Sequence, residues 1–540
     1  LHLFGYGNLS KEDLMNFRQL DSKTPGHPEY GHTVGVEATT GPLGAGMGMA
    51  VGMAMAEAHL ESVFNKENYP VVDHYTYVLG GDGCMMEGIS SEAFSLAGTL
   101  GLSKLIVLYD SNRISIEGST DIAFRENVQE RMQAFGFQTI TVEDGNDIDA
   151  IGKAIEAAKA DTEHPSFITI KTQIGFGCPA KQGKPSAHGE PLGVENVEAL
   201  RKNLNWPSEE PFFVPEEVYK NYSEIAEQKA EVEAAWNVMF AAYCEEYPEM
   251  EALWNQYHNA KAGEALKDDA GFWAKQEKPE ASRAISGRLI NYIKDVLPNL
   301  FGGSADLAPS NKTNMKDAGD FSKEDRAGRN LHFGVRELAM AAIGNGIMLH
   351  GGLRAYVSTF FVFSDYCKPM ARLSALMGVP LTYVFTHDSI GVGEDGPTHE
   401  PIEQMAALRA MPNFHVFRPC DATETEAAWY SAVTSEHTPT ALVLTRQNLE
   451  PMAGSSREAL KGGYIIDDCE GTPELILIAS GSEVALAVHA KETLAAEGQK
   501  VRVVSMPCMD LFEEQSEEYK EFVLPREVRR RVAVEALGSF

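Results

Sequence analysis

The sequence has little of what brings a protein to nucleic acids or membranes. Its 46 lysines and arginines are outnumbered by 78 aspartates and glutamates, which gives a formal net charge of −32. Because polyanions attract basic surfaces, this balance argues against nucleic acids and anionic membranes. No apolar run reaches the roughly 18 to 20 residues of a membrane span, and residues 1–20 lack a signal-peptide pattern. We expect neither a nucleic acid nor a membrane as partner.

Cysteine is scarce and follows no pattern. The seven cysteines are scattered, without a C-x-x-C pair or a matching histidine spacing. This argues against both a disulfide framework and a zinc-finger site. We therefore expect reduced thiols and a cytoplasmic location.

Two nucleotide-binding signatures are also missing. The glycine-rich segment T-T-G-P-L-G-A-G-M-G at 39–48 lacks the lysine and hydroxyl residue of a Walker motif. No G-x-G-x-x-G follows a predicted strand with an acid about 20 positions later, so a dinucleotide dehydrogenase is disfavoured. The segment at 39–48 enters a helix predicted over 49–57. There it can either cradle a phosphate or simply allow close packing.

What the sequence does contain is a recurring α/β pattern. A chain of 540 residues is too long to fold around a single hydrophobic core, so we predict about three domains. Short apolar runs alternate with helical stretches, as in parallel sheets covered by helices. We predict three tandem α/β domains with mainly parallel sheets at 1–205, 279–456 and 457–540, and a helical connection at 206–278. The predicted strands lie at 75–79, 105–109, 167–170, 353–358, 381–385, 416–417, 441–444, 475–478, 501–504 and 532–534.

Candidate metal ligands come directly after two of these strands. Asp82 stands in a G-G-D-G motif after the first strand, and Asn112 follows the next strand 30 residues later. One crossover helix fits that interval, and parallel strands joined in this way end at the same edge of the sheet. Carboxylate, amide and carbonyl oxygens suit Mg²⁺ or Ca²⁺ and leave positions for diphosphate oxygens. A lone G-D-G is more often a tight turn, so the inference depends on Asn112.

A second candidate acid, Glu337, opens a predicted apolar helix in the motif G-V-R-E. Taken alone, Glu337 is explained by the favourable interaction of a negative charge with the helix dipole. In combination with the other motifs, however, the whole chain resembles the transketolase family. The motifs are T-P-G-H-P-E at 24–29, T-T-G-P-L-G at 39–44, G-D-G-C-M-M-E-G at 81–88, G-G-S-A-D-L-A-P-S-N at 302–311, G-V-R-E at 334–337, H-D-S-I-G-V-G-E-D-G-P-T-H at 387–399 and T-R-Q-N at 445–448.

The resemblance implies a thiamine-diphosphate-binding fold and a transferase activity. The enzyme would move a two-carbon ketol unit from a ketose phosphate such as xylulose 5-phosphate to an aldose phosphate such as ribose 5-phosphate. The fragment would be carried as an enamine on thiamine diphosphate, with Mg²⁺ or Ca²⁺ as the metal. Such an enzyme serves the pentose phosphate pathway or Calvin-type sugar interconversion. It would be a homodimer with its active sites at the subunit interface.

The same resemblance implies roles for individual residues. Asp82, Asn112 and the Ile114 carbonyl would hold the metal. A buried, protonated Glu337 would activate the cofactor, and histidines titrating near neutral pH, namely His27, His188 and His387, would move protons. The cofactor would be lined by Gly41, Leu43, Gly83, Glu87, Glu92, Asn112, His188 and Asp306, with Phe360, Phe363 and Tyr366, at helical spacing, as the pyrimidine pocket. The substrate would meet His27, His188, Arg283, Ser310, His387, Asp395, His399 and Arg446.

Other interpretations remain open at this point. Dihydroxyacetone synthase and deoxyxylulose-phosphate synthase share the cofactor chemistry but use formaldehyde as acceptor or pyruvate as donor. A regulatory homologue without activity would be expected to lack Glu337 or the metal ligands, which are present. The arginines at 283 and 446 favour sugar phosphates, because guanidinium groups bind phosphate through paired hydrogen bonds.

The ends of the chain suggest a fragment. The sequence starts without Met, in what reads as a helix, and the strand at 532–534 is followed by only six residues. We expect that both natural termini are missing and that the third domain is truncated.

Overall fold

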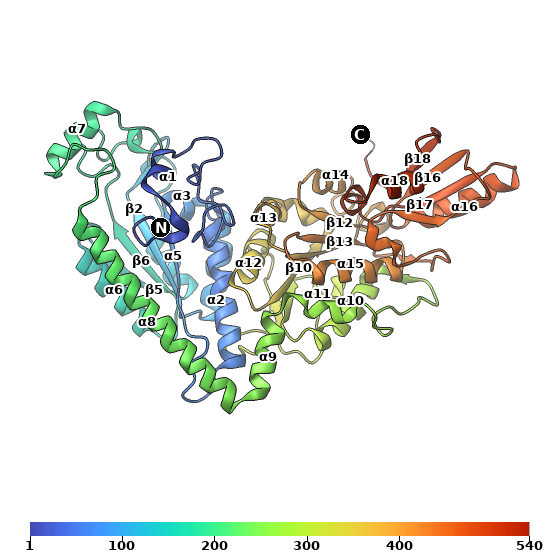
Figure 1. Ribbon diagram of the computed structural model, residues 1–540, viewed down its shortest axis with the longest axis horizontal. Helices are drawn as coiled ribbons and strands as arrows, with labels where there is room; N and C mark the ends of the chain where they lie inside the picture. Colours follow the sequence, from blue (N-terminus) through green and yellow to red (C-terminus); the bar gives the residue numbers. More distant parts are fainter. Residues whose placement is uncertain (539–540) are drawn as a thin grey trace. The chain divides into compact units, whose positions relative to one another are not determined.

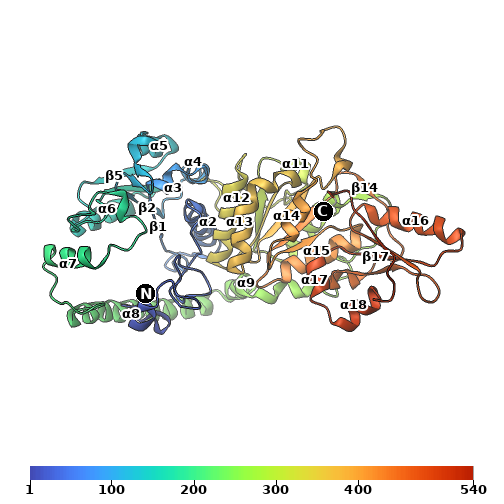
Figure 2. The same cartoon turned by 90° about the horizontal axis from the view of Figure 1, so that it is seen from above.

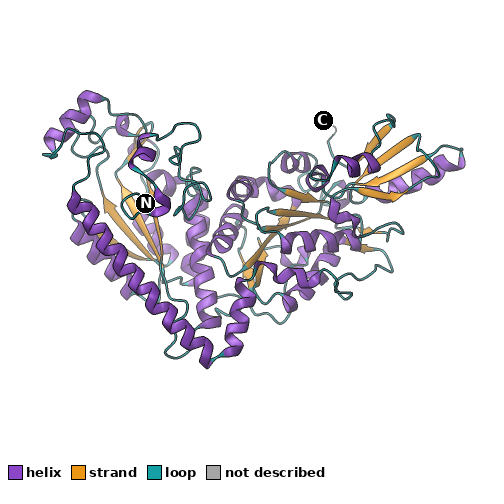
Figure 3. Ribbon diagram, viewed as in Figure 1, coloured by secondary structure: helices purple, strands orange, loops and turns teal. Residues whose placement is uncertain are grey.

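The computed structural model describes residues 1–538, which divide into two compact units. Unit 1 comprises Leu1–Ala252 and Ser322–Arg326, and unit 2 comprises Leu253–Phe321 and the chain from Ala327 onward. Each unit combines sheets with flanking helices (Figures 1 and 3). We describe each unit by itself.

Unit 1 is built on a four-stranded parallel sheet in the order β1-β2-β6-β5. Successive residues of a strand point to opposite faces. Ile168 of β6 packs on one face with Ala154 of α6, and Phe167 lies on the other face near Phe94 of α4. Helices therefore lie on both faces, as expected for a parallel sheet, but Tyr77 and Leu79 of the edge strand β1 stay exposed. The bounds are β1 Thr76–Gly81, β2 Leu105–Ser111, β5 Gln138–Val142, β6 Ser166–Lys171, α2 Ala45–Phe64, α3 Asp82–Met86, α4 Gly88–Leu100, α5 Val128–Phe135 and α6 Ile148–Ala160.

The remaining elements of unit 1 are short or helical. The longest is α8, the extended green helix of Figure 2, which lies inside the predicted helical connection. Their bounds are η1 Tyr6–Asn8, α1 Lys11–Met15, β3 Ile114–Ser115, β4 Gly118–Ser119, η2 Thr120–Ile122, η3 Pro185–Ala187, α7 Val194–Asn203, α8 Glu216–Glu246 and, running into unit 2, α9 Pro248–His258.

Unit 2 holds a six-stranded parallel sheet in the order β12-β13-β11-β10-β8-β9. The central strands β11 and β13 are buried along their whole length, because helices cover both faces. The bounds are β8 Leu300–Ser304, β9 Asn330–His332, β10 Arg354–Phe360, β11 Thr382–Thr386, β12 His415–Phe417, β13 Thr440–Leu444, α10 Ser282–Val296, α11 Ala308–Asn311, α12 Glu337–His350, η5 Phe361–Phe363, α13 Ser364–Met377, η6 Ile390–Val392, α14 Gln404–Arg409 and α15 Ala422–Thr434.

A second sheet of unit 2 has the order β15-β17-β16-β18, in which only β15 is antiparallel. The predicted α/β fold with mainly parallel sheets is confirmed, whereas the antiparallel β15 was not predicted. Within residues 1–538, no helix is both long and apolar enough to cross a bilayer. The remaining bounds are η4 Ala260–Leu266, β7 Glu280–Ala281, β14 Asn448–Leu449, η7 Arg457–Lys461, β15 Tyr464–Asp467, β16 Leu475–Ala479, α16 Glu483–Ala496, β17 Val501–Ser505, α17 Met509–Glu513, α18 Glu517–Val523 and β18 Arg531–Val534.

A glycine fixes how closely α4 and α5 approach. A Cβ atom on Gly98 would lie 1.7 Å from the Phe135 carbonyl oxygen, whereas a Cβ atom on the exposed Gly152 of α6 would meet nothing within 4 Å. We expect Gly98→Ala to lower the free energy of unfolding by about 1–3 kcal/mol through overpacking. Gly152→Ala should raise it by about 0.5–1 kcal/mol, because alanine loses less backbone entropy in a helix. Urea unfolding followed by circular dichroism measures both, and equal midpoints for the two variants would contradict this packing.

Candidate functional site

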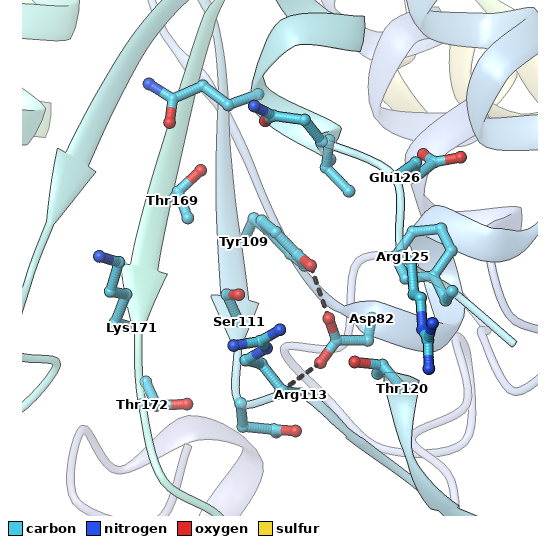
Figure 4. A pocket seen from close by; sticks show the side chains of 15 residues that line it. Asp82, Tyr109, Ser111, Arg113, Thr120, Arg125, Glu126, Thr169, Lys171 and Thr172 are labelled. Carbon is cyan, nitrogen blue, oxygen red and sulfur yellow. Dashed lines mark hydrogen bonds between the residues drawn. The ribbon is translucent and has the colours of Figure 1, made fainter. Parts of the chain in front are cut away.

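One candidate site lies at the carboxyl end of the unit 1 sheet. A cavity of about 540 Å³ opens there, and both Asp82 and Asn112 line it. Figure 4 shows Asp82 among the side chains around this cavity. Asp82 begins α3 directly after β1, and Asn112 follows β2. Because β1 and β2 are adjacent and parallel, with Gly81 opposite Asp110, their ends lie side by side. The predicted convergence of Asp82 and Asn112 on one edge is therefore seen in the structure.

The Asp82 carboxylate is buried and held by uncharged donors. Its side chain is only 4% exposed. The Tyr109 hydroxyl donates to Oδ1 at 2.6 Å, and the Arg113 backbone N–H donates to Oδ2 at 2.9 Å (Figure 4). Burial and Asp82 raise the pKa of Tyr109, so this hydroxyl stays protonated and donates. The amide oxygen of Asn112 accepts from the Ile114 N–H at 2.9 Å.

These residues fit a divalent cation. No lysine or arginine within residues 1–538 forms an ion pair with Asp82, so its buried charge lacks a counterion from that part of the chain. The same residues contain no group of three or more His, Cys, Asp or Glu side chains that could hold a metal. A metal here would therefore rely on amide and carbonyl oxygens and on oxygens of a ligand, as Mg²⁺ commonly does.

The glycine-rich segment lies against this edge. A Cβ atom on Gly83 would come 2.8 Å from Leu43, and one on Gly44 would come 3.1 Å from the Cβ atom of Glu87. Gly41 has a φ of +126° and lies beside the His27 ring. Gly44 also has a positive φ, of +80°, and glycine adopts both angles without strain. A Cβ atom on Gly44 would also come 2.5 Å from the Ile89 side chain.

Of the predicted site residues of unit 1, only Asp82 and Asn112 line this cavity, whereas the others do not, namely His27, Gly41, Leu43, Gly83, Glu87, Glu92, Ile114 and His188. His188 follows η3 and is exposed, and Glu92 is half-buried in α4. The roles assigned to these residues stay predictions.

A second candidate site lies in unit 2, at the ends of β10, β11 and β13. A cavity of about 450 Å³, which we call the unit 2 cup, is lined by Arg283, Ser310, Phe360, His387, Asp395, His399 and Arg446. Six of these seven were predicted to contact the substrate, and Phe360 was predicted to line the cofactor. Sequence positions spread over more than 160 residues thus meet in one place.

Two arginines and one acid, Asp395, line the unit 2 cup. Arg283 donates to the Ser310 carbonyl at 2.9 Å, and burial together with the nearby Arg446 lowers the pKa of Arg283. Arg446 in turn pairs with Glu394 at the rim. Because the charge of Arg446 disfavours that of Arg283, an anion between the two guanidinium groups would be favourable.

His387 is held as a neutral imidazole. Burial and the charges of Arg283 and Arg446 lower its pKa to about 4. This differs from the expectation that His387 titrates near neutral pH, because two cations face the ring. Its backbone φ is 62°, and its Nδ1 atom lies 2.8 Å from the Thr386 hydroxyl.

Aromatic rings extend the unit 2 cup. Phe360 stacks on Phe363 at a centroid distance of 6.0 Å, and Phe363 contacts Tyr366. Phe360 also meets the His387 ring at 3.8 Å, and Phe363 meets His399 at 5.5 Å. The three aromatic residues do not share one helix as their spacing suggested, because Phe360 ends β10, Phe363 ends η5 and only Tyr366 lies in α13.

Two other predicted cofactor residues of unit 2 lie outside the cup lining. Glu337 is the first residue of α12 and is half-buried, with its backbone carbonyl accepting from the Cys367 thiol at 3.5 Å. Asp306 is exposed and has a φ of 59°.

The sequence prediction missed the residues that support these sites. Tyr109 holds Asp82, and no motif pointed to it. Asn311 accepts from Thr386 at 2.7 Å and donates to Ser304 and Ser358, so it links β8, β10 and β11 behind His387. Asn311 belongs to the motif at 302–311, which was the available signal.

Comparison with known proteins decides the family. The model of the transketolase thiamine diphosphate binding domain matches residues 1–262, and the transketolase pyrimidine binding domain matches 278–452. The transketolase-like C-terminal domain matches 462–540. This chain belongs to the transketolase family.

Individual relatives agree with this assignment. The transketolase of Halalkalibacterium halodurans is 54% identical over the whole chain, which spans 81% of that relative. Solved transketolases from Leishmania mexicana and from Pichia stipitis, the latter in complex with sedoheptulose 7-phosphate, are each 45% identical, with TM-scores of 0.96 and 0.95. Both alignments cover 100% of this chain and 80% of the solved chain.

The charge state of His387 can be measured directly. Its low pKa means that the ring is neutral throughout the range from pH 5.5 to 8, and an anion between Arg283 and Arg446 should raise the pKa by offsetting their charge. We expect its NMR signal, assigned with His387→Gln, to stay constant over this range and to begin titrating there when ribose 5-phosphate is added. A midpoint near the unperturbed value of about 6.5 in the ligand-free protein would contradict this electrostatic description.

Proposed function

We propose that this transketolase-family enzyme transfers a two-carbon ketol unit from a ketose phosphate, such as xylulose 5-phosphate, to an aldose phosphate, such as ribose 5-phosphate. The observation that carries the proposal is the unit 2 cup, where Arg283 and Arg446 lie beside His387. In a chain of net charge −32, such a pair of arginines is well suited to a phosphorylated substrate. The sedoheptulose 7-phosphate complex of the Pichia stipitis relative supports the same substrate class.

We propose thiamine diphosphate as the cofactor, together with a divalent metal such as Mg²⁺ or Ca²⁺. The cofactor supplies a carbon nucleophile and an electron sink for cleaving the bond beside a ketose carbonyl. Asp82, Asn112 and the Ile114 carbonyl would hold the metal, which would also bind diphosphate oxygens. Gly41, Leu43, Gly83 and His188 would line the cofactor, and Glu337 would hold a proton at its pyrimidine ring.

Different residues of the unit 2 cup would contact different parts of the substrate. Arg283 and Arg446 would bind the terminal phosphate, with Ser310 and His399 beside it. A neutral His387 can both donate and accept hydrogen bonds, so it can orient a sugar hydroxyl and pass a proton. Asp395 would accept a hydrogen bond from another hydroxyl. The aromatic rings of Phe360 and Phe363 would exclude water from one side of the site.

The setting of the enzyme is also part of the proposal. We propose a homodimer with active sites at the subunit interface, as the family resemblance implies. We also propose a cytoplasmic location in the pentose phosphate pathway or in Calvin-type sugar interconversion. None of the seven cysteines, all of which lie within residues 1–538, forms a disulfide, which is compatible with a reducing compartment.

The phosphate role of Arg446 is open to test. Arg446→Ala should raise KM for ribose 5-phosphate roughly 10- to 100-fold, because a charge-assisted hydrogen bond is lost, and should change KM for unphosphorylated ribose far less. The control is Arg526→Ala, which removes an exposed arginine paired with Glu517 far along the chain. Steady-state kinetics with both acceptors measure the effect. Equal losses for ribose and ribose 5-phosphate would show that Arg446 does not bind the phosphate.

A further inference from the structure

A fully buried arginine connects the His387 loop to the second sheet of unit 2. Arg418 directly follows β12, and its side chain and that of Asp388 are both 0% exposed. The Arg418 Nε atom donates to Asp388 Oδ2 at 2.9 Å, and Nη2 lies at the same distance from that oxygen. Asp388 is the neighbour of His387 in the chain. One buried ion pair therefore lies directly behind a residue of the unit 2 cup.

The other side of the same guanidinium reaches the turn between β16 and α16. Nη1 donates to the Ser480 carbonyl at 3.0 Å and to the Glu483 carboxylate, and Nη2 donates to the Ser482 hydroxyl at 3.2 Å. The backbone strengthens the connection, because the Gly481 N–H donates to the Arg418 carbonyl at 2.9 Å. Arg418, Asp388 and Glu483, which we call the Arg418 clamp, thus join the two sheets.

The clamp contains two carboxylates but only one arginine. Uncharged groups donate further hydrogen bonds to both carboxylates. The Ala536 N–H donates to Glu483 at 3.1 Å, and the Ser389 hydroxyl donates to Asp388 at 3.2 Å. Glu483 is also the first residue of α16, where the helix dipole favours a negative charge. Burial of such a pair costs solvation, so the clamp is weak evidence for stability alone. A role in fixing geometry explains it better.

The backbone conformation of His387 explains why its neighbours in the chain need to be fixed. A φ of 62° is the left-handed region, which a non-glycine residue keeps only when its surroundings fix the chain on both sides. On the upstream side, Thr386 is fixed by its hydrogen bond to Asn311. On the downstream side, Asp388 is fixed by Arg418. Release of Asp388 would let His387 relax out of the cup.

We propose that Arg418 and Glu483 are positioning residues, which hold Asp388 and thereby aim His387 into the unit 2 cup. The second sheet of unit 2 then takes part in the geometry of the substrate site without touching the substrate. The kinetic part of this inference rests on the proposed ketol transfer, whereas the placement of His387 does not. Asp388 is therefore the link between a buried ion pair and the orientation of a substrate-binding ring.

The test compares two buried arginines of the same unit. Arg418→Lys keeps the positive charge but loses the branched hydrogen bonding. The control is Arg502→Lys, because the buried Arg502 of β17 also makes a paired contact with one carboxylate, that of the exposed Asp468, at 2.9 Å from each of its oxygens, and has no hydrogen bond to the His387 loop. The readouts are the NMR titration of His387 in the ligand-free protein, and kcat and KM for ribose 5-phosphate.

The expected results separate positioning from a merely structural role. Both variants should lower the thermal midpoint, but only Arg418→Lys should raise the pKa of His387 by at least about one unit toward its ordinary value and lower kcat/KM about 10- to 100-fold. An unchanged His387 titration and unchanged kinetics in folded Arg418→Lys would overturn the proposal. If that variant does not fold, Glu483→Gln, which removes one of the two carboxylates that orient Arg418, should move the His387 titration in the same direction, and an unchanged titration would overturn the proposal. A wild-type protein without ketol transfer would refute the proposed function, and the titration would still decide on the placement of His387.

Discussion

Parallel strand pairing is the constraint on which both candidate sites depend. In unit 1 it brings the ends of β1 and β2 together and with them Asp82 and Asn112. In unit 2 the register aligns Phe360 with Thr386, and Thr386 with Leu444, so the residues that come after these strands gather at one edge. Side chains that are distant in sequence become neighbours because the carboxyl ends of adjacent parallel strands lie at the same edge of the sheet.

Charge is the second constraint. A strongly acidic chain repels anions over most of its surface, so a phosphorylated substrate needs a local concentration of positive charge. The unit 2 cup provides it with two arginines, of which Arg446 disfavours the charge of Arg283, and together they lower the pKa of His387. Asp82 presents the opposite case, a buried carboxylate with only neutral donors, which suits a cation. Each site is thus complementary to the charge of the ligand proposed for it.

Prediction from the sequence succeeded best where local pattern decides the structure. Asp82 and Asn112 could be placed together because a strand, a crossover helix and a second strand leave few alternatives. The strand β15 was not predicted, because an antiparallel edge strand does not belong to a β-α-β unit and so lacks that sequence pattern. The role of Arg418 was not predicted, because its partners Asp388 and Ser480 lie 30 and 62 residues away in the sequence and no motif joins them. Phe360 was assigned to a helical spacing, but tertiary structure divides that segment between a strand end and two helices.

The most direct test of the central claim is a carbon-label transfer experiment on the enzyme. Xylulose 5-phosphate labelled with ¹³C at both C1 and C2 is incubated with unlabelled ribose 5-phosphate, thiamine diphosphate and Mg²⁺, and the products are examined by NMR. We expect the two labelled carbons to appear still bonded to each other at C1 and C2 of a seven-carbon ketose phosphate. The transfer should stop when thiamine diphosphate is omitted or the metal is chelated. Label that remains in the donor, or that moves without the cofactor, would contradict the account.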